Sequence, residues 1–367
     1  MLPLKPLPDC EGPKLAPFEH NLEADDVEFL KIMERETAHG KVIKTRIGDS
    51  IYAIKLFVHE TYVGSPRHLA YGEDGEFSLC CDAFESRFTP FENECRAFGR
   101  LQEAGCEHLA VKIHGYVALE LTKVIDQKLQ VARSKMRWPY LELVDFLSNG
   151  DGPTMGIVKD WVDMAECDNE DLRERYDRIT QINQFPRMLE DLHELHKSGI
   201  VVRDLKSDQY VNGILVDLSF AMTVPHPYGP DPSGLGRSWQ PRWTWQSMAA
   251  WDLYCFQTRV IDTWRKGADE LFEKVPRPKG MKKTCSMRAY DLSSRSRNLR
   301  PRAGQQQRPF LPLLNHEGLD IEMAQTPRYD PGDLIVNQAK RVTKNVKKRR
   351  AKAATSQKPK RGKATRK

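Results

Sequence analysis

Two aspartates and a lysine flank a predicted tight hairpin near the middle of the chain. Asp204 and Lys206 come before it, Asn212-Gly213 separates two apolar pairs, and Asp217 follows. Asn-Gly between apolar residues is a strong hairpin signal, because a type I′ turn needs positive φ at both central positions. The returning chain brings the two carboxylates to the same end of the ribbon. One can orient a nucleophilic hydroxyl and the other can hold a divalent cation, which suits a metal–phosphate site. The alternative is a surface hairpin flanked by ordinary solvated acids.

Strands and turns must position these residues. The strand-like runs lie at 27–33, 41–47, 51–57, 109–120 and 155–162. Gly48-Asp49 separates the second run from the third, as a hairpin turn requires. The polar stretch 58–90 is predicted to be a loop insertion, and the Pro-rich start of the chain an extended arm over 1–25.

Helical periodicity marks three further regions. Apolar residues repeat at helical spacing over 91–104, and Gly105 supplies a C-terminal stop. Residues 170–198 are predicted to form two helices with a break near Gln184. The segment 244–265 is apolar nearly all round, which indicates deep burial.

The segment around the hairpin resembles the catalytic segment of protein kinases. The run LHKSGIVVRDLKSDQ…LVDLS is similar to H-R-D-L-K-x-x-N followed by D-F-G. Upstream, the run YAIK ending at Lys55 resembles the V-A-I-K strand, and Glu94 lies where the glutamate that pairs this lysine would be. The run 156–162 resembles the strand and hinge between kinase lobes, and Asp252 resembles the aspartate that braces the catalytic loop. The ordered set implies an α+β, bilobal protein-kinase-like fold with a reduced C-lobe.

The resemblance implies a role for each matched residue. Asp204 would accept or orient the substrate hydroxyl, and Lys206 would neutralise the transferring phosphate. Asp217 and Gln209 would be the metal ligands. The nucleotide-binding residues would be Lys55, Glu94, Gly40, Val42 and Asp160. The implied cofactors are ATP and Mg²⁺.

Several departures from the kinase pattern count against activity. Arg35 and Thr37 occupy glycine positions of the phosphate loop, where side chains obstruct close approach of the backbone. Gln209 replaces the metal-binding asparagine and moves the amide carbonyl outward, although Mg²⁺ tolerates little geometric error. Ser219 replaces the glycine of D-F-G, and Val202 replaces the usual histidine. No A-P-E follows.

A narrower resemblance concerns the inner kinetochore. The opening run L-P-D-C-E-G-P-K-L-x-P-F-E, the run CRAFGRL and the segment V-V-R-D-L-K…Y-V-N-G-I-L-V-D-L-S…T-V-P-H-P-Y resemble one fungal family. Its members are described as kinase-like proteins related to a subunit of the Sim-four complex (the Fta-two-like domain). The similarity spans most of 7–265. It implies a kinetochore or chromatin role with protein partners.

The charge is divided unevenly along the chain. Residues 340–367 hold 14 of the 57 Lys and Arg residues and no Asp or Glu, so the remainder carries 43 basic against 51 acidic side chains. This tail lacks aromatic residues and is predicted to be disordered. Its two basic clusters suit a bipartite nuclear localisation signal, and the same charge suits nucleic-acid phosphates. A tail that only adds solubility is the alternative.

Composition narrows the class of protein. A mean hydropathy of -0.60 and the absence of a long apolar run exclude a transmembrane helix. The 8 Cys residues include no C-x-x-C pair, which indicates a reduced intracellular protein without a zinc ribbon.

The expected domains and functions follow from these observations. The domains are an arm over 1–25, an N-lobe over 26–159, a reduced C-lobe over 160–270, a low-structure linker over 271–339 and the basic tail. The favoured function is a nuclear pseudokinase or scaffold of a kinetochore-like assembly with retained ATP binding. The alternatives are an active ATP- and Mg²⁺-dependent Ser/Thr protein kinase and another phosphotransferase that acts on a small molecule.

Overall fold

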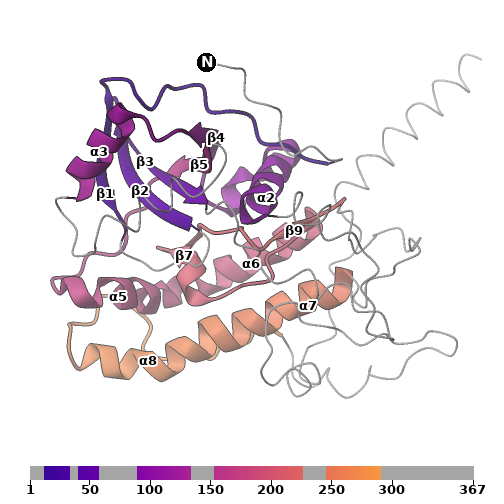
Figure 1. The fold of residues 1–367 in the computed structure, drawn as a ribbon. Helices are drawn as coiled ribbons and strands as arrows, with labels where there is room; N and C mark the ends of the chain where they lie inside the picture. The colour runs from indigo at the N-terminus through magenta and orange to yellow at the C-terminus, as the bar shows by residue number, and fades with distance from the viewer. Residues whose placement is uncertain (1–11, 34–39, 58–88, 134–152, 226–244, 291–367) are drawn as a thin grey trace, which may run out of the picture.

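The fold is seen in a computed structural model of the chain (Figure 1). It describes residues 12–33, 40–57, 89–133, 153–225 and 245–290. The tail 340–367, most of the predicted insertion 58–90, and both Arg35 and Thr37 lie outside these ranges. Within them, a five-stranded antiparallel sheet and several helices confirm the α+β class.

The sheet is antiparallel and has the strand order β1-β2-β3-β5-β4. Its strands are β1 (Val27–Ile32), β2 (Gly40–Ile47), β3 (Ser50–Phe57), β4 (Ile113–Leu119) and β5 (Thr154–Asp160). The predicted turn at Gly48-Asp49 joins β2 to β3, and Gly48 has a φ of 56°. This positive φ is accessible to glycine at no steric cost, which explains the residue at the turn.

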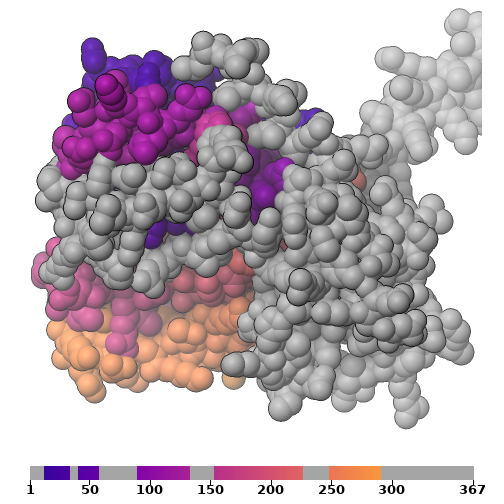
Figure 2. All heavy atoms as spheres, viewed as in Figure 1, coloured from indigo at the N-terminus to yellow at the C-terminus, as the bar shows by residue number. Residues whose placement is uncertain are grey.

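A helix packs on each face of the sheet. On one face, Ile125 of α3 (Lys123–Arg133) shares a hydrophobic cluster with Ile43 and Ile54. On the other face, Phe91 of α2 (Pro90–Ala104) shares a second cluster with Ile157. In the space-filling view, α3 covers the sheet on the side away from α8 (Figure 2). Helix α3 was not predicted from the sequence, although its buried residues Ile125, Leu129 and Ala132 follow a helical spacing.

The second half of the described chain is mainly helical. The helices are α5 (Arg173–Thr180), α6 (Phe185–Lys197), α7 (Trp245–Cys255) and α8 (Asp262–Phe272), with a π-helical turn at Phe256–Ile261 between the last two. Short 3-10 turns lie in this half at η3 (Glu170–Leu172), η4 (Gln181–Gln184) and η5 (Ser207–Gln209), and before β4 at η2 (Glu107–Leu109). The predicted helix pair with a break near Gln184 is confirmed. No helix in the described ranges has both the length and the apolar character that a bilayer crossing requires.

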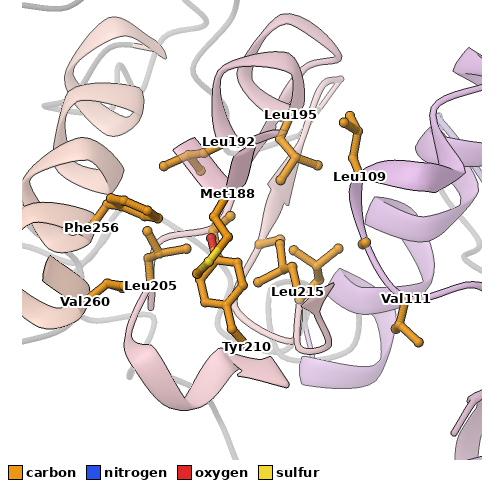
Figure 3. Packing of buried hydrophobic residues seen from close by; sticks show 14 of the residues in the cluster. Leu109, Val111, Met188, Leu192, Leu195, Leu205, Tyr210, Leu215, Phe256 and Val260 are labelled. Atoms are coloured by element: carbon orange, nitrogen blue, oxygen red, sulfur yellow. The ribbon is translucent and has the colours of Figure 1, made fainter. Parts of the chain in front are cut away.

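The predicted hairpin lies inside the larger hydrophobic cluster (Figure 3). It pairs β7 (Tyr210–Val211) with β8 (Ile214–Leu215), and a second short pair joins β6 (Ile200–Val201) to β9 (Met222–Thr223). Tyr210 and Leu215 pair across the hairpin and are both buried. Met188 and Leu192 of α6 meet them from one side and Phe256 from another. The surface-hairpin alternative is therefore wrong for the strands, which are held in the core.

The segments at the two ends of the described chain also contribute buried residues. Near the N-terminus, Leu15 joins the larger cluster, Leu22 joins the cluster on the α3 face of the sheet, and Pro17 forms a bridge to Tyr116 of β4. After α8, residues 273–290 form no helix or strand, yet Met281 and Ala289 are buried. The predicted C-lobe boundary at residue 270 falls within α8, and packing continues for a further stretch of chain.

The contact between the N-terminal segment and α2 can be tested at a glycine. A Cβ atom on Gly99 would lie 2.8 Å from the backbone carbon of Lys14, closer than a van der Waals contact allows. We expect Gly99→Ala to lower the free energy of unfolding by about 1–3 kcal/mol, because the backbone of the packed segment must move. Urea denaturation of the full chain measures this.

Gly267→Ala in α8 is the matched control for that variant. There, a Cβ atom would meet only side-chain tips, that of Ile179 at 3.4 Å and that of Arg175 at 3.7 Å. Alanine favours a helix over glycine by about 0.5–1 kcal/mol, so Gly267→Ala is expected to be neutral or stabilising. Equal effects of the two variants would contradict the packing of residues 12–18 on α2.

Candidate functional site

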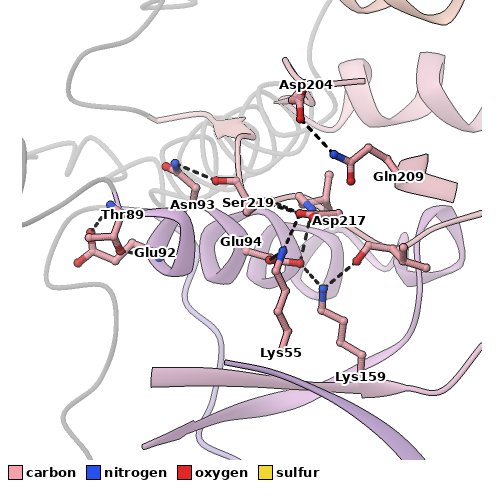
Figure 4. Close-up of polar contacts among 12 residues, drawn as sticks. Lys55, Thr89, Glu92, Asn93, Glu94, Lys159, Asp204, Gln209, Asp217 and Ser219 are labelled. Carbon is pink, nitrogen blue, oxygen red and sulfur yellow. Dashed lines mark hydrogen bonds and ion pairs between the residues drawn. The ribbon is translucent and has the colours of Figure 1, made fainter. Parts of the chain in front are cut away.

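Glu94 of α2 lies at the centre of a buried charged cluster (Figure 4). Its side chain is 0% exposed. Lys55 of β3 donates to Oε2 at 3.0 Å, and Lys159 of β5 donates to Oε1. The backbone N–H of Leu218 lies 3.4 Å from the same Oε1 atom. One carboxylate thereby joins a helix, two strands of the sheet and the segment after the hairpin.

Strand register explains why both lysines reach the same carboxylate. Lys55 pairs with Ile157 across β3 and β5, so their side chains share one face of the sheet. Lys159 lies two residues after Ile157, which returns its side chain to that face. Glu94 is held opposite because α2 is fixed at both ends. Thr89 and Glu92 form a capping box at its start, and Gly105 ends it with a φ of 66°.

Asp217 completes the cluster. Its Oδ1 atom accepts from Lys55 at 2.8 Å, from the backbone N–H of Ser219 at 2.9 Å and from the Ser219 hydroxyl at 2.6 Å. Ser219, at the position that the kinase resemblance assigns to a glycine, thus bonds directly to the aspartate. The Ser219 carbonyl in turn accepts from the side chain of Asn93 at 3.2 Å, which ties this segment to α2.

Burial and neighbouring charges shift the pKa values of this cluster in opposite directions. Burial alone would lower the pKa of Lys55, but Asp217 and Glu94 together raise it above the usual lysine value. Burial lowers the pKa of Lys159, and Glu94 only partly opposes this while Lys55 adds to it. Burial would raise the pKa of Asp217, but Lys55 and Lys159 hold it well below the usual aspartate range. Asp217 is therefore a carboxylate at neutral pH.

Asp204 lies in a second polar group at the start of the hairpin. Its Oδ2 atom accepts from Gln209 at 3.2 Å and lies 3.1 Å from the Lys206 ammonium. Arg259, in the π-helical turn, lies 3.7 Å from Oδ1. In the close-up, Asp204 and Gln209 lie on the opposite side of Asp217 from Lys55 (Figure 4).

A buried aspartate fixes the chain just before Asp204. Asp252 of α7 accepts from the backbone N–H groups of Val202 and Arg203, both at 2.7 Å, and lies 3.0 Å from His196 Nε2. Its side chain is 0% exposed. Arg203 has a φ of 71°, an unusual backbone conformation for a residue other than glycine. The two hydrogen bonds that these N–H groups donate to Asp252 hold this conformation and so fix where Asp204 lies.

The turn of the hairpin has the backbone that its sequence predicts. Asn212 has a φ of 46° and Gly213 a φ of 72°, as a type I′ turn requires. The backbone N–H of Asn212 donates to both oxygens of the buried Asp177, at 3.2 Å and 3.1 Å. The hairpin therefore closes tightly enough to bring Asp204 and Asp217 to one end.

The structure brings most of the predicted site residues into these two groups. Lys55, Glu94 and Asp217 are in direct contact, and Asp204 contacts Lys206 and Gln209.

The other predicted residues lie outside both groups. Val42 pairs with Lys55 across β2 and β3, and Gly40 begins β2, where a Cβ atom would come within 2.6 Å of the Leu56 carbonyl oxygen. Asp160 ends β5 and lies 2.6 Å from His114.

Two residues of the site were not predicted. Lys159 lies in an otherwise apolar strand and is buried, which is unusual for a lysine. Its position in that strand was the one feature of the sequence that could have indicated its role. Arg259 reaches Asp204 from a distant helix, and the spacing of the sequence gives no indication of that contact.

Lys55 and Asp217 are the residues whose chemistry suits a phosphate and a metal ion. Lys55 is a cationic donor, the type of residue that holds a phosphate. Oδ1 of Asp217 has three donors, and Gln209 donates its amide N–H to Asp204. Within the described ranges, no group of three or more His, Cys, Asp or Glu side chains is arranged to hold a metal.

Comparisons with known proteins identify the family. The model of the family described as Kinetochore Sim4 complex subunit FTA2 matches residues 3–222, which is more than half of the chain. The matched range includes Lys55, Glu94 and Asp217. A search of curated proteins finds no match. The relationship to the Sim4 kinetochore subunit that the sequence motifs predicted is confirmed.

The central role of Glu94 predicts a large loss of stability on removal of its charge. In Glu94→Gln, two buried lysines would face the single carboxylate of Asp217. Breaking a buried ion pair on one side costs about 3–5 kcal/mol, so we expect a loss of that size in the free energy of unfolding. Urea denaturation of the full chain measures it.

Glu103→Gln on the same helix is the control. Glu103 is 52% exposed and pairs with Arg100 at 3.3 Å, so its loss is expected to cost less than about 1 kcal/mol. If Glu94→Gln lowered the free energy of unfolding no more than this control does, the burial of the two lysines would not depend on the charge of Glu94.

Proposed function

The chain belongs to the family of the Sim4 kinetochore complex subunit FTA2, and from this membership we propose that it is a kinetochore-associated protein of the nucleus. A subunit of a complex acts by binding other subunits, so its principal partners are proteins. The basic tail 340–367 supports this location, because its charge suits an import receptor as well as nucleic-acid phosphates.

We propose further that the described residues form a bilobal, protein-kinase-like body. The antiparallel sheet with Lys55, the helix with Glu94 and the hairpin between Asp204 and Asp217 follow one another in the kinase order. Asp252 bonds the loop that carries Asp204, which is the brace that the kinase resemblance implies. These features support a pseudokinase or scaffold built on that fold.

One observation carries the proposal that this body binds a nucleotide. Lys55 donates to Glu94 at 3.0 Å and to Asp217 at 2.8 Å, so its ammonium group is fixed between the sheet and the hairpin segment. In kinases the equivalent lysine holds the phosphates of ATP and the glutamate orients it. A lysine held this way is already placed for a phosphate, and ATP is the expected ligand.

A second candidate is an active ATP- and Mg²⁺-dependent Ser/Thr protein kinase or another phosphotransferase. The contact of Asp204 with Lys206, at 3.1 Å, favours it, because these residue types orient a hydroxyl and a phosphate in kinases. However, Gln209, Lys206 and Arg259 all approach the Asp204 oxygens, so a substrate hydroxyl would compete with them. Gln209 and Ser219 also replace residues of the kinase pattern. The loss of one electrostatic contact typically costs about 10²–10³ in rate, which favours the scaffold.

Nucleotide binding predicts a thermal shift of the full chain with ATP and Mg²⁺. Ligand at 100 times its dissociation constant adds about 2.7 kcal/mol to the stability, a shift that differential scanning fluorimetry resolves. We expect a positive shift for the wild type and none for Lys55→Met. Each variant is compared with and without ligand, so a lower starting stability does not affect the result.

Lys123→Met is the matched control for this experiment. Lys123 is exposed on α3, on the face of the sheet opposite Glu94, and this variant should shift as the wild type does. If the wild type showed no shift at millimolar ATP, the nucleotide proposal would fail and the kinetochore role would rest on the family alone.

The kinetochore role predicts a focal nuclear signal. In cells that contain the chain naturally, a fluorescently tagged full chain is expected to coincide with centromeric chromatin. A version that ends at residue 339 should lose nuclear accumulation, because it lacks the 14 basic residues of the tail. Restoration by an unrelated import signal would separate import from binding. A diffuse nuclear signal of the full chain would contradict the proposed assembly.

A further inference from the structure

The site contains one buried lysine more than the kinase pattern requires. We propose that Lys159 takes over part of the charge neutralisation that a divalent cation normally supplies, so that the site binds a nucleoside triphosphate equally well with and without a divalent cation. This inference rests on the proposed nucleotide binding and adds the form in which the ligand is bound.

Lys159 belongs to the buried charged cluster by its burial and by its hydrogen bonds. It is buried, donates to Oε1 of Glu94, and donates to the Val216 carbonyl at 2.8 Å. Val216 immediately precedes Asp217, so the ammonium group lies next to the segment that would meet the phosphates. The ammonium group also lies 5.3 Å from the ring centre of Phe98, and this packing holds it in place.

Lys159 changes the net charge of the cluster from negative to neutral. Lys55, Glu94 and Asp217 alone carry one positive and two negative charges, and such a buried set repels a polyanion. Lys159 brings the set to two positive and two negative charges. Charges in a low-dielectric interior interact much more strongly than in water, so one additional cation at this distance matters. The neutral cluster accepts a triphosphate without first needing a metal to cancel its charge.

The contacts around the candidate metal ligands point the same way. Mg²⁺ demands a near-ideal octahedral arrangement of oxygen ligands. Oδ1 of Asp217 is taken by Lys55 and by both donors of Ser219. A cation at Oδ1 would have to displace one of these donors. These donors therefore compete at Oδ1 with the metal that a nucleotide carries.

Isothermal titration of the full chain with ATP tests this directly. One series contains excess Mg²⁺ and the other contains EDTA. We expect the two dissociation constants to agree within about threefold. Binding that appears only with Mg²⁺ would overturn the inference while the proposed nucleotide binding stands. Absence of binding in both series would overturn both.

Lys159→Met tests which residue is responsible. Without this cation, we expect binding in EDTA to weaken at least about tenfold, and binding with Mg²⁺ to weaken much less. Lys123→Met on α3 should leave both dissociation constants unchanged. A Lys159→Met protein that binds ATP in EDTA as tightly as the wild type would overturn the role of Lys159. The wild-type comparison stands by itself if the variant fails to fold.

Discussion

The burial of the Glu94 carboxylate is the constraint on which the rest of the structure depends. A carboxylate without solvent exposure is very costly unless cations and hydrogen bonds surround it. Lys55 and Lys159 come from different strands, and the Leu218 N–H comes from the segment after the hairpin. These parts can satisfy Glu94 only if the sheet, α2 and the hairpin segment meet at one point. The ion cluster therefore constrains how the elements assemble, and the hydrophobic packing must be compatible with that arrangement.

Two further buried carboxylates fix the backbone before the hairpin and at its turn. Asp252 fixes the backbone of Val202 and Arg203, and Asp177 fixes the turn through the N–H of Asn212. Glu94, Asp252 and Asp177 all accept hydrogen bonds from backbone N–H groups that would otherwise be buried without a partner. The chain between Asp204 and Asp217 thus has little freedom, since its start, its turn and its end are each held by a separate acid.

The sequence predicts those parts of the site that depend on local signals. The Asn212-Gly213 turn needs positive φ twice, and the helix around Glu94 carries a regular apolar face and a glycine stop, so both could be located from spacing alone. Lys159 could not, because its importance lies in strand register with Lys55 and not in any neighbour along the chain. Arg259 is a contact across about 55 residues of chain, which depends on how α7 and the π-helical turn pack. Residues 273–290 were not predicted to pack because they bury single side chains without periodicity.

The proposed nucleotide binding and catalysis would place different demands on this site. Binding of a nucleotide would need cationic groups, and Lys55 and Lys159 are held in place by contacts that already exist. Catalysis needs an aspartate whose oxygens are open to a substrate hydroxyl, whereas those of Asp204 are approached by Gln209, Lys206 and Arg259. A protein that acts within an assembly needs a fixed shape more than turnover. The Arg259 contact also holds the segment before the hairpin to the π-helical turn at Phe256–Ile261, so an interaction that stabilises the shape also occupies Asp204.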